Sequence, residues 1–240
     1  TKHEFLFGTG AFFSVPLCDP EGTGEKKAYL ELRDKIKREI INLYKEDLKK
    51  IDPSGRLSDI YNSIPSQLSK KKNRFVITTA TKKQKTSKDE ERLYELIDSK
   101  IVLPCYNVSS PSIALNQTRD NNNFKLYLSD IGLFVTMIFD NGNGINSEIY
   151  KQLMGDHLSE NLGYLYENAI AQIIASKNRD LFYHTWKENN NLRPFEVDFI
   201  ISDKNKISPI EVKSSSIAKH RSLDRFNEKY SKHINNSYII

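Results

Sequence analysis

Two apolar strands near the C-terminus carry charged residues inside them, and this feature constrains the fold most. The segment is FEVDFIISDKNKISPIEVKSS, from Phe195 to Ser215. Alternate side chains of a strand face opposite ways, so Asp198, Glu211 and Lys213 share one face if the strands pair across the short polar turn. Charged groups inside a sheet are costly unless they are paired, exposed or bound to a cation. The pattern therefore predicts a hairpin with a shared polar site.

The helix before this hairpin brings a further carboxylate towards the same place. In HLSENLGYLYENAIAQIIASK, apolar residues recur at helical spacing through Ile170 and Ile174. Glu167 lies three positions before the first of these and seven before the second, at the edge of the apolar stripe, where it can face the sheet. On the first strand, alternation assigns one face to four apolar residues and the other face to two acids, namely Phe195, Val197, Phe199 and Ile201 against Glu196 and Asp198.

This grouping of residue types is suited to the chemistry of phosphodiesters. Two or three carboxylates around one point bind a hard divalent cation such as Mg²⁺ through oxygen. Such a cation polarises a phosphoryl oxygen and acidifies a bound water, and a neighbouring lysine stabilises the developing charge. The alternative is an exposed hairpin face with a lysine–carboxylate pair worth under ~1 kcal/mol. The spacing of two acids and a lysine on adjacent strands, behind a helix with an inward glutamate, favours a shared site.

The order of predicted elements indicates an α/β (α+β) fold in two parts. Helices expected over residues 26–51, 56–69 and 86–100, followed by strands over 101–108 and 124–130, have the order of a winged helix. A structural linker of three helices and a hairpin has the same order. After a helix over 131–139, the rest of the chain has the order αβββαβ. We therefore expect an unplaced segment over residues 1–25, a helical winged-helix-like module over 26–120 and an α/β domain over 121–240.

Composition excludes several classes of protein. The 240 residues include only two cysteines, Cys18 and Cys105, which match no disulfide or zinc spacing and indicate a reducing, cytoplasmic setting. The longest apolar run, over 131–139, is too short to cross a bilayer, and no signal peptide is seen. The segment GTGEKK, at 22–27, lacks the GxxxxGK[ST] spacing of a phosphate loop, so we expect no ATP binding by this chain.

A basic stretch precedes the third predicted helix. Residues 70–92 hold nine Lys or Arg and three Asp or Glu, within a chain of net charge +5. Such a stretch can contact nucleic-acid phosphates without reading bases, although a charge run is more often a solvated face. The three acids at 89–91 open the helix and disfavour phosphate there. The candidate nucleic-acid contacts are Lys70, Lys71, Lys72, Arg74, Lys82, Lys83 and Lys85.

Taken together, these motifs resemble a known family. KLYLSDIGL, YLYEN, EVDFII and PIEVKSS, with RLSDIYNSIPSQLSKK and LIDSKIVLPCYNVSSPSIAL before them, are similar to the C-terminal region of bacterial and archaeal AAA-type ATP-binding proteins. That domain of unknown function in turn resembles the PD-(D/E)xK nuclease superfamily. The resemblance covers roughly residue 37 to the end and implies a restriction-endonuclease-like core. It makes Glu167 the helix glutamate, Asp198 and Glu211 the metal carboxylates for Mg²⁺ or Mn²⁺, and Lys213 the catalytic-type lysine.

The resemblance leaves two functions open. The first is a metal-dependent nuclease, or nuclease-like nucleic-acid-binding module, of an AAA-type ATPase. The second is a nuclease-fold module that has lost the chemistry and serves protein–protein contact or regulation of the ATPase. Members of this family normally carry an N-terminal ATPase domain with a phosphate loop, which is missing from this sequence. The chain is therefore expected to be a fragment, with the ATPase domain as its partner.

Overall fold

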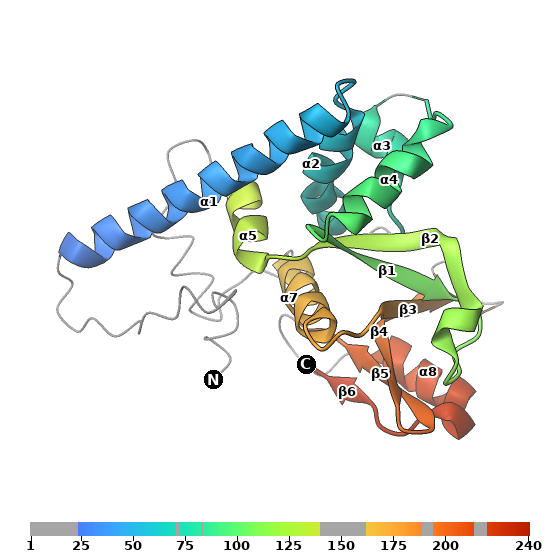
Figure 1. Cartoon of the computed structure of the whole chain (residues 1–240). Coiled ribbons are helices and arrows are strands. Elements are labelled where there is room, and N and C mark those ends of the chain that lie inside the picture. Colours follow the sequence, from blue (N-terminus) through green and yellow to red (C-terminus); the bar gives the residue numbers. More distant parts are fainter. Residues whose placement is uncertain (1–23, 71–72, 83, 140–161, 189–193, 214–219) are drawn as a thin grey trace. The chain divides into compact units, whose positions relative to one another are not determined.

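The structure is a computed structural model that describes residues 24–70, 73–82, 84–139, 162–188, 194–213 and 220–240 (Figure 1). Almost all of the segment expected over residues 1–25 lies outside these ranges, as do Lys71, Lys72 and Lys83. The chain forms two compact units. Unit 1 comprises Thr1–Pro65, Ile77–Ile101 and Asp130–Leu158, and unit 2 comprises Ser66–Val76, Val102–Ser129 and Ser159–Ile240.

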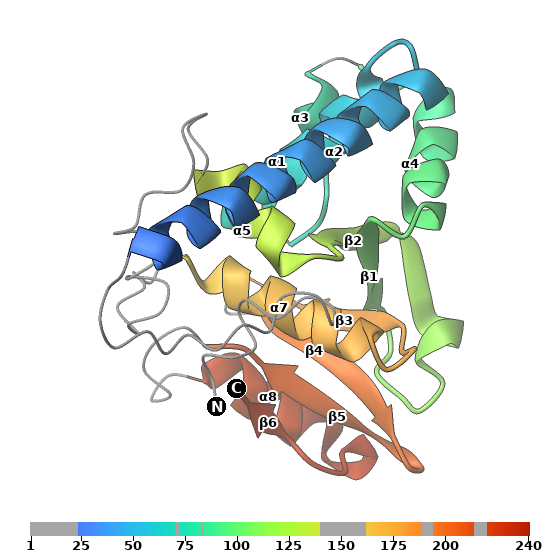
Figure 2. The same ribbon diagram turned by 60° about the vertical axis from the view of Figure 1, so that its left-hand side comes forward.

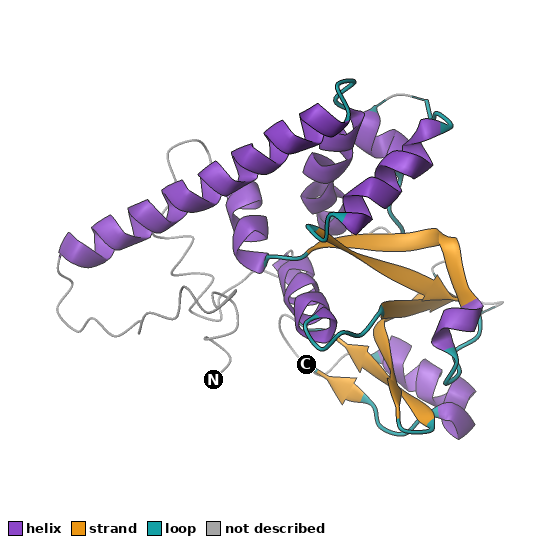
Figure 3. Ribbon diagram, viewed as in Figure 1, coloured by secondary structure: helices purple, strands orange, loops and turns teal. Residues whose placement is uncertain are grey.

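The described part of unit 1 is helical. Its elements are α1 (Gly24–Ile51), most of α2 (Arg56–Ser69), α3 (Ile77–Thr81), α4 (Lys88–Asp98) and α5 (Ile131–Phe139) (Figure 3). A turn over residues 52–55, with the sequence DPSG, joins α1 and α2. Gly55 takes a positive φ of 77° there, and the Asp52 carboxylate accepts the N–H of Leu57 at 3.0 Å in the first turn of α2.

An ion pair buried in unit 1 holds the start of α4. Asp89 is fully buried and accepts Arg56 Nε at 2.8 Å and the backbone N–H of Thr86 at 2.7 Å. Arg92 approaches the same carboxylate at 3.1 Å. Ser87 precedes the helix at the N-cap position but makes no capping bond with its side chain. The first acid of α4 is therefore a buried structural group. Its charge is not evidence against phosphate binding at the surface of the protein.

Unit 2 is built on a six-stranded mixed sheet with the order β2-β1-β3-β4-β5-β6. The strands are β1 (Val102–Val108), β2 (Arg119–Leu128), β3 (Leu181–Trp186), β4 (Phe195–Asp203), β5 (Lys206–Glu211) and β6 (Tyr238–Ile239). The pairs β1–β3 and β5–β6 are parallel, and the other neighbours are antiparallel. Helix α7 (Gly163–Ala175) contacts β2, β1 and β3, and α8 (Arg221–Tyr230) contacts β4 and β5 (Figure 2).

The sheet confirms the predicted α+β fold but changes its division. The order α7, β3, β4, β5, α8, β6 is the αβββαβ order expected from the sequence. The two strands predicted as a wing, β1 and β2, do pair with each other, yet β1 also pairs with β3 and continues the sheet of unit 2. The expected boundary at residue 120 therefore differs from the structure, in which both units are discontinuous in sequence. Alternation within one hairpin carries no signal for a distant third strand, and this is why the sequence suggested a wing.

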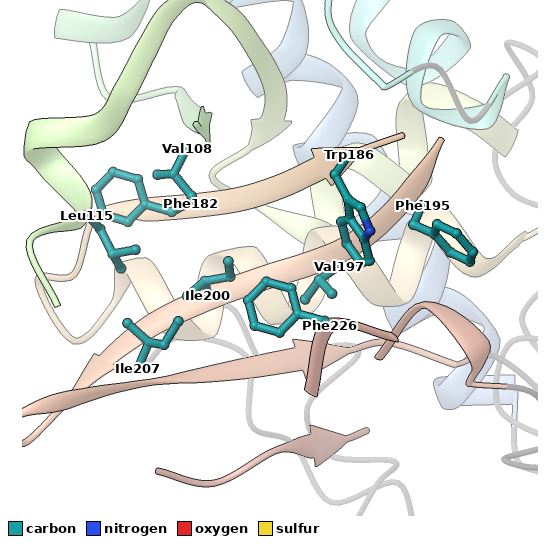
Figure 4. Close-up of a cluster of buried hydrophobic side chains, with 9 residues drawn as sticks. All are labelled: Val108, Leu115, Phe182, Trp186, Phe195, Val197, Ile200, Ile207 and Phe226. Carbon is teal, nitrogen blue, oxygen red and sulfur yellow. The ribbon is translucent and has the colours of Figure 1, made fainter. Parts of the chain in front are cut away.

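One face of the sheet is closed by an apolar cluster under α8. It consists of Val108, Leu115, Phe182, Trp186, Phe195, Val197, Ile200, Ile207 and Phe226 (Figure 4). Phe226 comes from α8, and the ring of Trp186 stacks on that of Phe195 with centroids 5.4 Å apart. The opposite face carries α7 (Figure 4). The cluster anchors β3 and β4, so the acids of β4 project from a rigid element.

A buried histidine beside this cluster stays neutral. His184 Nδ1 donates to the Val108 carbonyl at 2.6 Å, because that oxygen can only accept, and Nε2 accepts the hydroxyl of Tyr230 at 3.0 Å. His184 is 3% exposed, and its ring stacks on that of Trp186. Burial lowers the pKa of His184 to about 4.

We expect this histidine to reduce stability as the pH falls. Below pH ~6.5 the unfolded chain binds a proton that folded His184 excludes, so the free energy of unfolding drops by about 1.4 kcal/mol per unit down to pH ~4. Urea unfolding of the wild type and of His184→Gln at pH 7.5, 6.5 and 5.5 measures this. The raised pKa values of Asp198 and Glu211 act in the opposite sense in both proteins, so the difference isolates His184. Equal slopes in the two proteins would contradict the expectation.

Candidate functional site: a carboxylate and lysine cluster at β4 and β5

The two acid-bearing strands pair and then separate where the charged residues lie. Backbone pairing of β4 with β5 runs as far as Phe199 and Ile210. Beyond that point, the Asp198 carboxylate accepts the N–H of Val212 at 2.8 Å. The N–H of Lys213 turns instead to the carbonyl of Ile240, at 2.7 Å. The strands thus diverge at Asp198 and open a polar site at the end of the hairpin.

A bulge in β4 places Asp198 at this point. The partners of β3 shift by one residue between Ile200 and Val197, so Asp198 and Phe199 together oppose Tyr183. A bulge of this kind locally re-aims side chains and is frequent beside functional sites.

The bulge changes the predicted alternation along β4. Phe199 was expected to share the face of Val197, but Ile200 takes that place in the apolar cluster. Phe199 packs instead against the ring of Tyr127 on β2, with centroids 5.6 Å apart. The physical reason is the extra residue, which shifts the period of two by one position from the bulge onward.

Glu211 is the most buried acid of the site. It is 6% exposed, and its Oε1 accepts the ammonium of Lys213 at 2.5 Å. Its Oε2 is buried and has no hydrogen-bond partner among the residues that the structure describes. Burial raises the pKa of Glu211 against the effect of Lys213, and the nearby charges of Glu167 and Glu196 raise it further. An oxygen in this position calls for a cation or a proton.

Asp198 is in the same electrostatic environment. Burial raises the pKa of its carboxyl well above the usual value, and the charges of Glu167 and Glu211 add to the rise. Lys125 on β2 lowers it in part. The structure therefore brings the three predicted acids within mutual electrostatic reach, although they come from α7, β4 and β5.

Glu167 faces the sheet from α7 and is held there by β2. Its Oε2 accepts the hydroxyl of Tyr127 at 3.2 Å and lies 3.8 Å from Lys125 Nζ. The next residue, Asn168, is fully buried and pairs with both backbone groups of Leu128, at 2.8 Å each. This side-chain amide acts like a short strand partner for β2 and sets the position of the helix that carries Glu167.

Two residues of the cluster were missed by the sequence reasoning. Lys125 of β2 is 5% exposed, and its Nζ lies 2.6 Å from Glu196 Oε1. Carboxylates, Glu196 first, keep the pKa of Lys125 above its ordinary value although burial acts to lower it. Alternation had placed Glu196 on the face of Asp198 without giving it a role. The signal for Lys125 was its position inside the apolar strand KLYL, where a lysine needs a partner.

The donor set fits a cation that demands few protein ligands. Among the described residues, no group of three or more His, Cys, Asp or Glu side chains is arranged to hold a metal ion. Glu167 contacts Tyr127 and Lys125, and one oxygen each of Glu196 and Glu211 contacts a lysine. The second oxygen of Glu196 and that of Glu211 have no hydrogen-bond partner among the described residues. Mg²⁺ is usually bound through one or two carboxylates, with water and substrate phosphate completing its shell. The buried, unpartnered Oε2 of Glu211 agrees with that requirement.

The predicted nucleic-acid contacts are not gathered on one unit. Lys70 and Arg74 are exposed on unit 2, whereas Lys82 and Lys85 belong to unit 1. Lys85 is already paired with Glu90 at 2.7 Å.

A hollow with both apolar and polar lining residues lies beside the cluster on unit 2. Its volume is about 720 Å³, and Arg74, Lys187, Asn123 and Thr185 are among the residues that line it. Thr185 is the register partner of Glu196, so the hollow adjoins the acidic cluster. Sequence reasoning found Arg74 but missed Lys187.

The fold and site define a class of α+β protein. It has a mixed sheet with helices on its two faces and a cluster of acids and lysines where β4 and β5 diverge. The chain belongs to the family described as "Domain of unknown function (DUF8612)", whose model matches residues 20–146. Residues 162–240 match "Domain of unknown function (DUF4143)", a domain often found at the C-terminus of AAA-type ATPases. No curated protein and no solved structure matches the chain.

These matches confirm one part of the predicted resemblance and leave the rest a prediction. The C-terminal match agrees with the predicted likeness to the domain of unknown function of AAA-type ATPases. Neither a nuclease family nor a winged-helix family is matched. None of the helices in the described ranges has the length and apolar character needed to cross a membrane.

Proposed function

We propose that unit 2 is a nuclease-like module that binds a divalent cation and cleaves phosphodiester bonds of nucleic acid, as the C-terminal part of an AAA-type ATPase. One observation carries the proposal. The buried Oε2 of Glu211 has no described partner, and it belongs to a cluster in which the pKa values of two carboxyls are raised. Carboxylates with such raised pKa values are typical of functional sites, and a bound cation would balance their negative charge.

Each residue of the site then has a role. Asp198 and Glu211 would hold Mg²⁺ or Mn²⁺, which when bound polarises a phosphoryl oxygen and acidifies water. The ammonium of Lys213 donates a hydrogen bond to Glu211 Oε1. It would stabilise the negative charge that develops on the phosphate by donating a hydrogen bond to a phosphate oxygen. Glu167 would act as a third acid that tunes the charge of the site from α7. Arg74 and Lys187 offer point charges to neighbouring phosphates in the hollow.

A second candidate is a module that keeps this fold without the chemistry and binds a protein partner or regulates the ATPase. The observation in its favour is that three of the acids already form ion pairs with lysines. Lys125 pairs with Glu196 and Glu167, and Lys213 pairs with Glu211. For either function we propose a cytoplasmic setting. The described cysteine, Cys105, is a free thiol and is buried in the sheet, as expected of a protein from a reducing compartment.

Lys213→Ala tests the nuclease proposal. The expected result is a loss of Mn²⁺-dependent cleavage by about 100-fold, with Mn²⁺ affinity retained, because the lysine acts on the phosphate rather than on the cation. Labelled single- and double-stranded DNA and RNA serve as substrates. Lys206→Ala, on the same hairpin, is the matched control and should cleave like the wild type. Cleavage unaffected by Lys213→Ala would refute the role of the lysine, and no cleavage of any substrate by the wild type would favour the second candidate.

A further inference from the structure

Lys125 is a buried cation in the middle of the site. Its Nζ lies 2.6 Å from Glu196 Oε1 and 3.8 Å from Glu167 Oε2. The ammonium also lies 5.1 Å from the centre of the Tyr183 ring. The hydroxyl of Tyr183 is itself tied to the backbone carbonyl of Asn73 at 2.5 Å. The ammonium is thus held by two carboxylates and by a ring that is fixed in place.

The charges around Lys125 do not balance without a further cation. The cluster holds four carboxylates, on Glu167, Glu196, Asp198 and Glu211, and two ammonium groups, on Lys125 and Lys213. When all are ionised, the missing charge equals that of one divalent ion. Lys125 lies against Glu196 and Glu167, and Lys213 lies against Glu211. Asp198 forms no ion pair with a described residue and accepts the backbone N–H of Val212. Glu196 Oε2 and Glu211 Oε2 are both buried without a hydrogen-bond partner among the described residues.

We propose that Lys125 takes the place of a second divalent ion, so that the site is built to hold one ion, between Asp198 and Glu211. Two-metal sites place their ions ~3.5–4 Å apart and share carboxylates between them. Here an ammonium occupies the second position, and its contact with Glu196 has the length of a strong charge-assisted hydrogen bond. Lys125 is therefore a positioning residue that keeps Glu196 and Glu167 away from the ion. This inference rests on the cation binding of the proposed function.

Counting bound ions tests the inference. Free Mn²⁺ is followed by electron paramagnetic resonance as it is titrated into the wild type and variants, without substrate. The wild type should bind one ion. Two ions in the wild type would overturn the role of Lys125 while leaving the proposed function standing, whereas no ion at all would remove the proposed function and this inference with it. Lys125→Met should gain a second ion, because Glu196 and Glu167 lose their cation. One ion or none in a folded Lys125→Met protein would overturn the inference.

A matched pair of variants keeps the test decisive even if Lys125→Met fails to fold. Glu196→Gln and Glu211→Gln make the same isosteric change on neighbouring strands. Glu196→Gln should keep one Mn²⁺ with nearly unchanged affinity, since that carboxylate serves Lys125. Glu211→Gln should weaken binding by at least about 10-fold. Equal losses in the two variants would show that Glu196 also holds the ion, and would overturn the inference.

Discussion

Asp198→Asn is expected to abolish Mn²⁺-dependent cleavage and to make the protein more stable. Cleavage should fall by at least about 100-fold, because the change removes one of the two carboxylates proposed to hold the cation. The amide oxygen of asparagine can still accept the N–H of Val212, so the divergence of β4 and β5 should persist. A loss of activity with the fold intact separates a role in chemistry from a role in folding.

The gain in stability follows from the electrostatics of Asp198. Because its pKa is raised in the folded protein, folding becomes less favourable as the pH rises through that pKa. Asparagine carries no charge at any pH and escapes this cost. The melting temperature of Asp198→Asn should exceed that of the wild type by about 2–4 °C at pH 8, and by less at pH 5. Calorimetry in EDTA measures it, and a variant less stable than the wild type at pH 8 would contradict the account.

Arg56→Met is expected to destabilise unit 1 more than any surface change. The guanidinium of Arg56 forms two hydrogen bonds to the fully buried Asp89. Without the guanidinium, the charge of this carboxylate is neutralised only in part, by Arg92. We expect the melting temperature to fall by about 10 °C. Thermal unfolding followed by circular dichroism measures this drop.

Two further variants show whether the effect comes from the orphaned charge. Arg56→Met/Asp89→Asn should recover part of the loss, because asparagine has no charge and can still accept the Thr86 N–H. Lys85→Met breaks the exposed pair with Glu90 and should shift the melting temperature by less than about 2 °C. A similar small shift for Arg56→Met would show that the buried pair contributes little.

Local patterns in the sequence anticipate the elements of the fold well. The period of two in FEVDFIIS and ISPIEV gives β4 and β5, and the spacing of Ile170 and Ile174 gives α7. The turn between β4 and β5 also appears where expected. These features depend on neighbours in sequence, which the chain itself reveals.

What the sequence did not reveal depends on distant contacts. The place of β1 in the large sheet rests on its pairing with β3, far along the chain. The bulge at Asp198 is set by how β3 and β4 align, which no alternation within β4 can show. Lys125 and Glu196 meet from strands 71 residues apart. A lysine within an apolar strand signals that a partner exists, but only the fold shows which one.

The most direct measurement of the central claim is a crystal of the protein soaked with Mn²⁺ and a short duplex, with the ion located by its anomalous scattering. The account predicts one peak, within about 2.0–2.5 Å of a carboxylate oxygen of Asp198 and of Glu211, with Lys125 still on Glu196. A peak coordinated by Glu196 and Glu167, or no peak near the hairpin at saturating Mn²⁺, would contradict it.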